Sequence, residues 1–202
     1  MPHYYDREPV SPSKRNKIFC EFEKVRFTFF SDASVFSKKQ IDFGSRLLIT
    51  TAINDISQND LTGRLLDLGC GYGVIGIVMK KVFPWLSVVM ADINQRAIEL
   101  CTENAKLNQI ENIDIQSSDG WTDISGSFSL ILMNPPVRAG KNIVFDFYDG
   151  AFEHMTPGGR LYVVLQKKQG APSSIEHLKD LFGNCRVLDK KSGYHILMAE
   201  KI

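Results

Sequence analysis

The chain has 202 residues, a length that fits one domain with a sizeable hydrophobic core. Its hydrophobic content of 44% and charged content of 23% are typical of a globular protein, and a net charge of +1 does not by itself indicate a nucleic-acid partner. No apolar run reaches the length of a membrane span, and the first residues have no signal-peptide core. The four cysteines form no C-x-x-C pair. We therefore expect a cytoplasmic chain with no membrane contact and no metal.

A hairpin and a helix are expected before the main run of elements. Residues 1–15 hold three prolines and little apolar periodicity, and we expect them to form a loose arm. Apolar residues alternate over 17–22 and 25–30, which predicts two strands of a hairpin. Helical spacing over 41–53 predicts a helix. We expect residues 16–55 to be an extension of the main domain.

Strand and helix patterns then alternate from residue 56 to residue 202. The expected strands are 64–68, 86–91, 113–116, 128–133, 159–166, 185–188 and 194–200. The expected helices are 74–82, 95–108, 143–155 and 174–182. Such alternation implies right-handed crossovers and a mainly parallel sheet. The sequence therefore predicts an α/β fold with a doubly wound sheet of seven strands.

The first of these strands leads into a turn with glycine at alternate positions, Gly69, Gly71 and Gly73. Glycine permits a tight turn and lets the backbone approach a ligand where a Cβ atom would obstruct it. The next strand is followed by Asp92, at about the 20-residue offset at which an acidic side chain meets ribose hydroxyls. A glycine turn after one strand and a carboxylate after the next predict a cofactor that contains a nucleoside.

Several features favour S-adenosylmethionine over NAD or ATP. The turn lacks the G-x-G-x-x-G spacing that seats a pyrophosphate on a helix N-terminus, and no Walker lysine motif follows any strand. Asp67 precedes the turn, where a carboxylate would repel a pyrophosphate but attract the amino group and sulfonium of S-adenosylmethionine. The third strand leads to Asp119, a potential acceptor for an adenine amino group, and to Trp121, a potential apolar wall.

The fourth strand ends at Asn134-Pro135-Pro136, the most informative motif of the chain. Consecutive prolines stop strand pairing, fix their own φ angles and push Asn134 out of the helical region. The resulting stiff loop suits the binding of a planar amino group through its hydrogens. The alternative interpretation is a simple turn, which Asn-Pro often marks.

In this order the motifs resemble those of class I S-adenosylmethionine-dependent methyltransferases. The segment 34–48, which includes Val-Phe-Ser and Asp-Phe-Gly-Ser, is similar to the corresponding segment of the guanine-N2 ribosomal RNA methyltransferases of the RsmC/RlmG type. The chain also resembles the short, single-domain bacterial members of that group, where Asn-Pro-Pro is followed by Arg-Ala-Gly-Lys and later by Gln-Lys-Lys-Gln-Gly-Ala-Pro. The resemblance covers residues 16–202. One departure is Val137, because amino-methylating enzymes commonly have an aromatic residue there.

The resemblance implies a Rossmann-like methyltransferase domain over residues 16–202, with its core at 56–202. It further implies that the last strand is antiparallel and inserted between its two predecessors. The implied cofactor is S-adenosylmethionine, and the implied partner is RNA, either ribosomal RNA or a ribosomal particle.

The candidate site residues fall into three groups. The catalytic candidates are Asn134, Pro135 and Pro136. The cofactor-binding candidates are Asp67, Gly69, Gly71, Gly73, Asp92, Ile93, Asp119, Gly120, Trp121 and Asn134. The substrate-binding candidates are Phe36, Lys38, Lys39, Val137, Arg138, Lys141, Lys167 and Lys168. Loops at the carboxyl ends of parallel strands share one face, so the basic residues are expected to converge there, unless they are only solvated surface.

These residues suit methylation of a guanine N2 amino group in RNA. The Asn134 carboxamide oxygen and the Pro135 carbonyl would accept the two hydrogens of the amine and direct its lone pair at the methyl group. Two alternatives stay open. One is methylation of another planar amine, adenine N6 or a protein glutamine amide, and the other is an inactive fold that binds RNA as an assembly factor.

Overall fold

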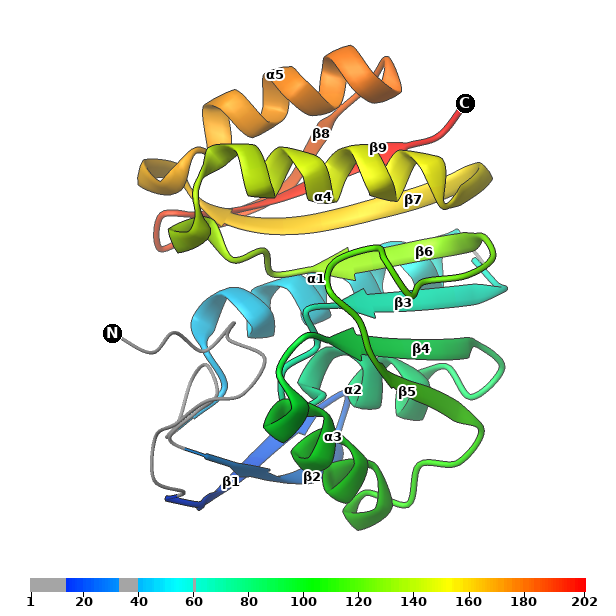
Figure 1. The fold of residues 1–202 in the computed structure, drawn as a ribbon, viewed down its shortest axis with the longest axis vertical. Helices are drawn as coiled ribbons and strands as arrows, with labels where there is room; N and C mark the ends of the chain where they lie inside the picture. Colours follow the sequence, from blue (N-terminus) through cyan, green and yellow to red (C-terminus); the bar gives the residue numbers. More distant parts are fainter. Residues whose placement is uncertain (1–13, 33–39, 60) are drawn as a thin grey trace.

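A seven-stranded sheet with helices on both faces forms the body of the molecule (Figure 1). The computed structural model describes residues 14–32, 40–59 and 61–202. The strands of the sheet are β3 (Arg64–Leu68), β4 (Ser87–Asp92), β5 (Ile113–Ser117), β6 (Phe128–Met133), β7 (Met155–Gln166), β8 (Arg186–Lys191) and β9 (Tyr194–Glu200). The helices are α1 (Phe43–Gln58), α2 (Val74–Val82), α3 (Gln95–Leu107), α4 (Lys141–Glu153) and α5 (Ala171–Phe182).

The strand order is β5-β4-β3-β6-β7-β9-β8. β3 pairs in parallel with β4 and β6, and β9 is antiparallel to both of its neighbours, β7 and β8. The chain thus starts in the middle of the sheet, winds to one edge and then to the other. This confirms the doubly wound, mainly parallel sheet of seven strands and the antiparallel last strand between its two predecessors. The carboxyl ends of β3 and β6 lie side by side where the winding reverses, which is where such folds bind ligands.

Two hydrophobic layers separate the sheet from its helices. One layer joins the sheet to α1, α2 and α3, and the other joins it to α4 and α5. The central strands are apolar on both faces: Leu65 and Leu66 of β3 are fully buried in opposite layers. This double burial is typical of parallel sheets and explains why the strands appear in the sequence as nearly continuous apolar runs.

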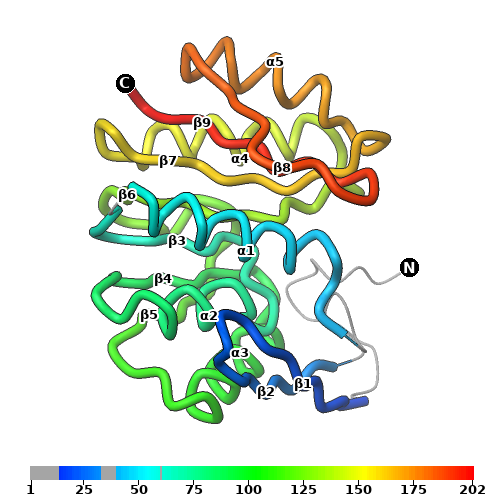
Figure 2. The backbone as a smooth tube through the Cα atoms, turned by 180° about the vertical axis from the view of Figure 1, so that it is seen from behind, coloured from blue at the N-terminus to red at the C-terminus, as the bar shows by residue number. Residues whose placement is uncertain are grey.

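The expected N-terminal hairpin is present, as β1 (Asn16–Phe22) and β2 (Val25–Ser31). Its two turn residues, Glu23 and Lys24, have φ angles of 47° and 63°. Positive φ at both central residues gives the turn a twist that matches paired strands. The hairpin packs over α2 and α3 on the same side of the sheet as α1 (Figure 2).

The hairpin is joined to α3 by two side-chain amides. The Oδ1 atoms of Asn104 and Asn108 accept from the backbone N–H groups of Phe30 and Thr28, at 2.7 and 3.0 Å. Their Nδ2 groups donate back to the carbonyls of the same two residues, at 2.9 and 2.8 Å. One face of α3 therefore takes the place of a third strand along the edge of β2.

Several elements begin away from the expected positions, and a capping side chain explains one of these differences. α1 begins at Phe43 rather than residue 41 because the Asp42 side chain caps it by accepting from the Ser45 N–H. α4 and α5 begin earlier than expected, after the glycines Gly140 and Gly170. Short 3-10 turns, η1 (Val137–Ala139) and η2 (Lys167–Gln169), precede these glycines.

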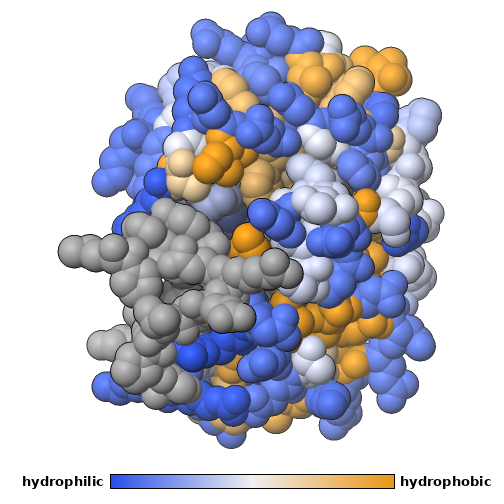
Figure 3. Space-filling view, viewed as in Figure 1, coloured by the Kyte–Doolittle hydropathy of each residue, from blue (hydrophilic) through white to orange (hydrophobic). Residues whose placement is uncertain are grey.

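The surface seen in Figure 3 is largely hydrophilic, with hydrophobic side chains in several separate groups. No helix in the described ranges is long and apolar enough to cross a membrane. Among the same residues, no three His, Cys, Asp or Glu side chains gather as a potential metal site.

Candidate functional site

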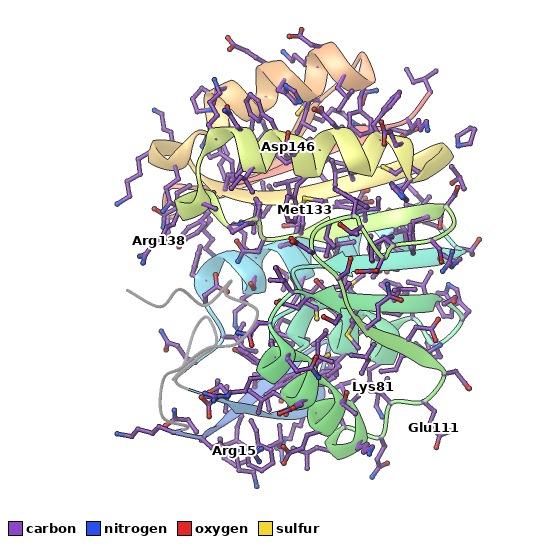
Figure 4. The ribbon with its side chains drawn as sticks, viewed as in Figure 1. Arg15, Lys81, Glu111, Met133, Arg138 and Asp146 are labelled. Atoms are coloured by element: carbon purple, nitrogen blue, oxygen red, sulfur yellow. The ribbon has the colours of Figure 1, made fainter. Side chains whose placement is uncertain are left out.

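Two connected pockets lie at the carboxyl ends of β3, β4 and β6. The first, here the α1 pocket, is bounded by the N-terminal end of α1, the glycine turn after β3 and the loop after β6. The second, here the α4 pocket, is bounded by the loops after β4 and β5 and by α4. Gly69, Asp92 and Asn134 line both pockets and so mark the place where they meet. Figure 4 shows Arg138 at this end of the sheet and Glu111 at the opposite end.

The glycine turn presents its backbone to the pockets. Gly69 and Gly71 have φ angles of 75° and 56°, and a Cβ atom on either would meet no other atom within 4 Å. Such a Cβ would stand in the open pocket, in the space that a cofactor needs. Gly73 has a different role from the one expected, because its Cβ position is 2.6 Å from the Cys101 sulfur and the residue lines neither pocket. It allows α3 to pack closely and caps α2.

Asp92 stands at the meeting point with its carboxylate held by the backbone. Its Oδ2 accepts from the Gly71 N–H at 2.8 Å, and its Oδ1 accepts from the Asn94 N–H at 2.9 Å. Burial raises the pKa of Asp92 above its ordinary value, while these backbone hydrogen bonds oppose the rise. Each carboxylate oxygen has a further lone pair that can accept from a ribose hydroxyl.

Asp67, expected to attract the cofactor, does not reach either pocket. It is fully buried, and its Oδ2 accepts from the Gly76 N–H in α2 at 2.9 Å. Its Oδ1 has no hydrogen-bond partner in the described structure, and burial raises its pKa to about 7. Asp67 therefore holds the first turn of α2 against β3. The sequence showed that the residue precedes the turn but not that its side chain points into the sheet–helix layer.

Ser45 of α1 anchors the Asn134 side chain in the loop after β6, although the sequence did not identify Ser45 as a site residue. The Nδ2 group of Asn134 donates to the Ser45 hydroxyl of α1 at 3.0 Å. Its Oδ1 makes no hydrogen bond with the described residues, so it is the end of the amide that remains available in the pockets. Ser45 also lines the α1 pocket. The only sequence signal for Ser45 was its place in the segment 34–48.

The two prolines make the rest of this loop compact. The Pro135 carbonyl accepts from the Val137 N–H, and the Pro136 carbonyl accepts from the Ala139 N–H, both at 2.8 Å. The bond to Pro136 closes the 3-10 turn η1, whereas the bond to Pro135 spans only two residues and closes a tighter turn before it. Pro135 lines the α1 pocket and Pro136 the α4 pocket, so each proline faces one of the two cavities.

The α4 pocket has a polar and an apolar side. Ile93, Asp119 and Gly120 line it as expected, together with Ser118. Trp121 does not: its ring stacks on His154 with centroids 4.9 Å apart, and it fills the space beside Gly150 of α4. The apolar wall instead comes from α4 and the turn before it. The wall residues are Ala139, Ile143 and Phe147.

The expected basic residues are brought together only in part. Arg138 lines the α1 pocket and also a neighbouring hollow between η1, α4 and α5, here the α5 hollow, which Lys141 and Val137 share. Lys167 and Lys168 are exposed on η2 and line none of these cavities. Phe36, Lys38 and Lys39 lie outside the described residues.

Comparison with known proteins identifies the family of this chain. The family model described as "methyltransferase small domain" matches residues 26–198. The chain belongs to this family. The match confirms, at the level of the family, the expected class of S-adenosylmethionine-dependent methyltransferase and its cofactor.

Two relatives of this methyltransferase differ in how much of their own length the chain covers. An uncharacterized protein of Bacillus subtilis is 43% identical over 202 residues, which are 99% of this chain and 98% of the relative. Ribosomal RNA small subunit methyltransferase C of Haemophilus influenzae is 33% identical over 173 residues, which are 84% of this chain and 50% of the relative. The chain thus spans about half the length of the small subunit methyltransferases that it matches.

A solved structure shares the fold. The T. thermophilus 16S rRNA N2 methyltransferase RsmC, in complex with AdoMet and guanosine, superposes with a TM-score of 0.84 at 23% identity. The match covers 96% of this chain and 52% of that one. It confirms the Rossmann-like methyltransferase fold.

Proposed function

We propose that this protein methylates the exocyclic N2 amino group of a guanine in ribosomal RNA, with S-adenosylmethionine as methyl donor. The observation that carries the proposal is Asn134, whose amide is held by Ser45 at the meeting point of the two pockets with its Oδ1 available. Relatives named ribosomal RNA small subunit methyltransferase C support the class of substrate. The T. thermophilus N2 methyltransferase, described with guanosine, supports the acceptor atom.

The residues around the meeting point fit the cofactor. Gly69 and Gly71 leave room for it, and Asp92 presents carboxylate oxygens for the ribose hydroxyls. Asp119 would accept from the adenine amino group, with Phe147 as apolar wall. When bound, S-adenosylmethionine supplies a methyl group activated by the sulfonium. The whole described chain from residue 16 onward serves as one methyltransferase domain in this proposal.

Asn134 would orient the acceptor amine. A guanine N2 amine is a poor nucleophile because its lone pair is delocalised into the ring. The Asn134 Oδ1 would accept one amine hydrogen, and the remaining lone pair of the Pro135 carbonyl would accept the other. Placing the nitrogen in line with the methyl group can contribute on the order of 7–11 kcal/mol. No strong base is needed, since the methylated nitrogen is cationic and releases its proton to water.

The basic residues near the pocket would bind the RNA backbone. Arg138 stands at the mouth of the α1 pocket, with Lys141 in the adjoining α5 hollow. Lys167 and Lys168 are exposed on the neighbouring turn η2. These positions suit phosphate contacts, while the target base enters the pocket unpaired or flipped, which costs a few kcal/mol when it has to leave a duplex.

Analysis of the methylated product tests this function. The wild-type protein and Asn134→Ala would be incubated with labelled S-adenosylmethionine and unmodified small-subunit ribosomal RNA, either naked or assembled with proteins. Digestion to nucleosides and mass spectrometry should reveal N2-methylguanosine with the wild type and little with the variant. Label in N6-methyladenosine or in protein glutamine would refute guanine N2. Binding of S-adenosylhomocysteine and RNA without any transfer would indicate an RNA-binding assembly factor.

A further inference from the structure

The outward face of the N-terminal hairpin carries an exposed aromatic residue. Side chains alternate along β1 and β2, so that Ile18, Phe22, Phe27 and Phe29 are buried against α2 and α3. On the opposite face, Phe19 is 72% exposed. An exposed phenyl ring in the middle of an ordered strand contributes nothing to the core. It is therefore available to a ligand.

A lysine lies between Phe19 and a second ring on this face. Lys17 pairs across the hairpin with Phe30, and Phe19 pairs with Thr28. The Lys17 Nζ lies 5.4 Å from the centroid of the Phe19 ring and 5.8 Å from that of Phe30. The face thus combines flat apolar surfaces with a positive charge at a fixed position between them. We call these residues, Lys17, Phe19, Thr28 and Phe30, the hairpin face.

The hairpin concentrates the positive charge of the chain. Residues 14–31 hold five basic and two acidic side chains, a net charge of +3, while the whole chain has +1. The remainder is therefore slightly negative. Arg26, at the far end of the hairpin face, has 93% of its side chain exposed. A polyanion would be attracted to this segment more strongly than to the molecule as a whole.

The open end of the hairpin lies close to the cofactor site. β2 ends at Ser31, and the Asp32 carboxylate that follows it lies 3.8 Å from the Arg96 guanidinium in the first turn of α3. Asn94, the cap of that same turn, lines the α1 pocket. The pair of Lys17 and Phe30 is at this end of the hairpin, next to the pair of Asn16 and Ser31. Figure 4 shows Arg15 on this part of the molecule, below the sheet.

We propose that the hairpin face binds an unpaired stretch of the RNA substrate, with a base stacked on Phe19 and a neighbouring phosphate bound by Lys17. This inference rests on the function proposed above and adds a second contact surface, separate from the basic residues near Arg138. Proteins that bind single-stranded nucleic acid combine aromatic platforms with basic side chains in this way. Sequence-tolerant stacking would hold RNA beside the pocket while the target base enters it.

The charge favours RNA over a second protein molecule as the occupant. A second copy of this chain would bring the same +3 hairpin or a slightly negative remainder, whereas RNA brings one negative charge per nucleotide. The exposed apolar surface of the hairpin face also consists mainly of one ring, Phe19, which suits a single base better than the broad apolar core of a protein interface.

Binding measurements on matched variants test the proposal. Fluorescence anisotropy would follow a short fluorescein-labelled single-stranded RNA of mixed sequence, and a duplex of the same length. Phe19→Ala should raise the Kd for the single strand about fivefold or more, the effect of one lost stacked base. Phe19→Trp keeps an aromatic ring and should retain the wild-type affinity for the single strand. The affinity for the duplex should change little in either variant. Trp85→Ala is the control, because Trp85 is 62% exposed between α2 and β4 and has no place in the proposal.

Salt dependence tests the role of Lys17. Lys17→Ala should reduce the slope of log Kd against log salt by about 0.7, the value for one contact with a single-stranded phosphate. Lys191→Ala removes an exposed charge on β8, far along the sheet, and should leave the slope unchanged. In methylation assays, Phe19→Ala should raise the KM for ribosomal RNA without changing the KM for S-adenosylmethionine.

Three results would overturn the proposal. Equal single-strand affinity in wild type and Phe19→Ala would remove the hairpin face from RNA binding, while the methyltransferase function would stand if N2-methylguanosine still formed. A wild-type dimer that dissociates on Phe19→Ala, with RNA affinity unchanged, would show that the face joins two copies. A wild-type protein that binds neither RNA probe would refute this inference, while formation of N2-methylguanosine would still decide the proposed function.

Discussion

The hydrogen bond between Ser45 and Asn134 gives the sharpest test of the acceptor geometry. Ser45→Ala removes the hydroxyl that accepts from Asn134 Nδ2 at 3.0 Å, while the Ser45 N–H can still donate to Asp42 and cap α1. Alanine is also at least as good a helix former as serine. The fold should therefore keep its melting temperature, and the effect should appear in catalysis.

The expected magnitude follows from the strength of one neutral hydrogen bond. A bond of this kind contributes about 0.5–1.5 kcal/mol, so Ser45→Ala should lower kcat about 2- to 13-fold as the amide of Asn134 loses its fixed orientation. Asn134→Ala removes a preorganised polar group at the reacting atoms, a change that lowers kcat about 100- to 1000-fold in comparable sites. Ser45→Thr keeps a γ-oxygen and should retain most of the activity.

A double-mutant cycle measures whether the two residues act as a unit. Single-turnover rates of methyl transfer would be measured for the wild type, both single variants and the double variant, together with the affinity for S-adenosylhomocysteine. If Ser45 acts through Asn134, Ser45→Ala should lower the rate no further in the Asn134→Ala background. The same loss in both backgrounds would refute the positioning role. A change in cofactor affinity equal to the change in rate would show that Ser45 serves the cofactor instead.

Three further predictions concern the cofactor site and the RNA surface. Burial raises the pKa of Asp67 in the folded state to about 7, against an ordinary value of 3.8, so the free energy of unfolding should fall as the pH rises from 4 to 7. Denaturant titrations should show that Asp67→Asn removes about 4 kcal/mol of this pH dependence. An equal pH dependence of the free energy of unfolding in both proteins would contradict the raised pKa. Calorimetry should show that Asp92→Ala weakens S-adenosylhomocysteine binding by one to a few kcal/mol, through the loss of charge-assisted hydrogen bonds to the ribose, and unchanged affinity would mean that the ribose has another partner. Replacing Lys167 and Lys168 with alanine should flatten the salt dependence of RNA binding without changing cofactor affinity, whereas an unchanged slope would identify them as solvated surface.

The central elements were predictable because their burial is visible in the sequence. β3 and β6 occupy the residues expected, 64–68 and 128–133, since strands buried on both faces are continuous apolar runs. The glycine turn and Asp92 were also predictable, because adjacent residues at the end of a strand stay adjacent in the fold. The start of β7 was not, because its pairing with β6 shifts register between Phe128 and Leu130.

What could not be predicted is the direction of individual side chains and contacts over long separations. Asp67 and Trp121 belong to motifs beside the pockets, but one side chain points under α2 and the other under α4. Ser45 and Asn134 are 89 residues apart, and no local pattern links them. The apolar wall of the α4 pocket comes from residues such as Phe147, whose helical spacing in the sequence only indicates a buried face.

Asn104 shows that the N-terminal hairpin is not a detachable appendage. The residue is fully buried, and its amide makes three hydrogen bonds: Oδ1 accepts from the Phe30 N–H, and both Nδ2 hydrogens are donated, to the carbonyls of Phe30 and Tyr72. Tyr72 stands inside the glycine turn, between Gly71 and Gly73. A chain shortened to begin at α1 would expose the face of α3 that carries Asn104. It would also remove the Phe30 backbone that holds the Asn104 amide in place beside the Tyr72 carbonyl. Through Asn104, α3 thus links the edge of the hairpin directly to the backbone of the turn that lines the α1 pocket.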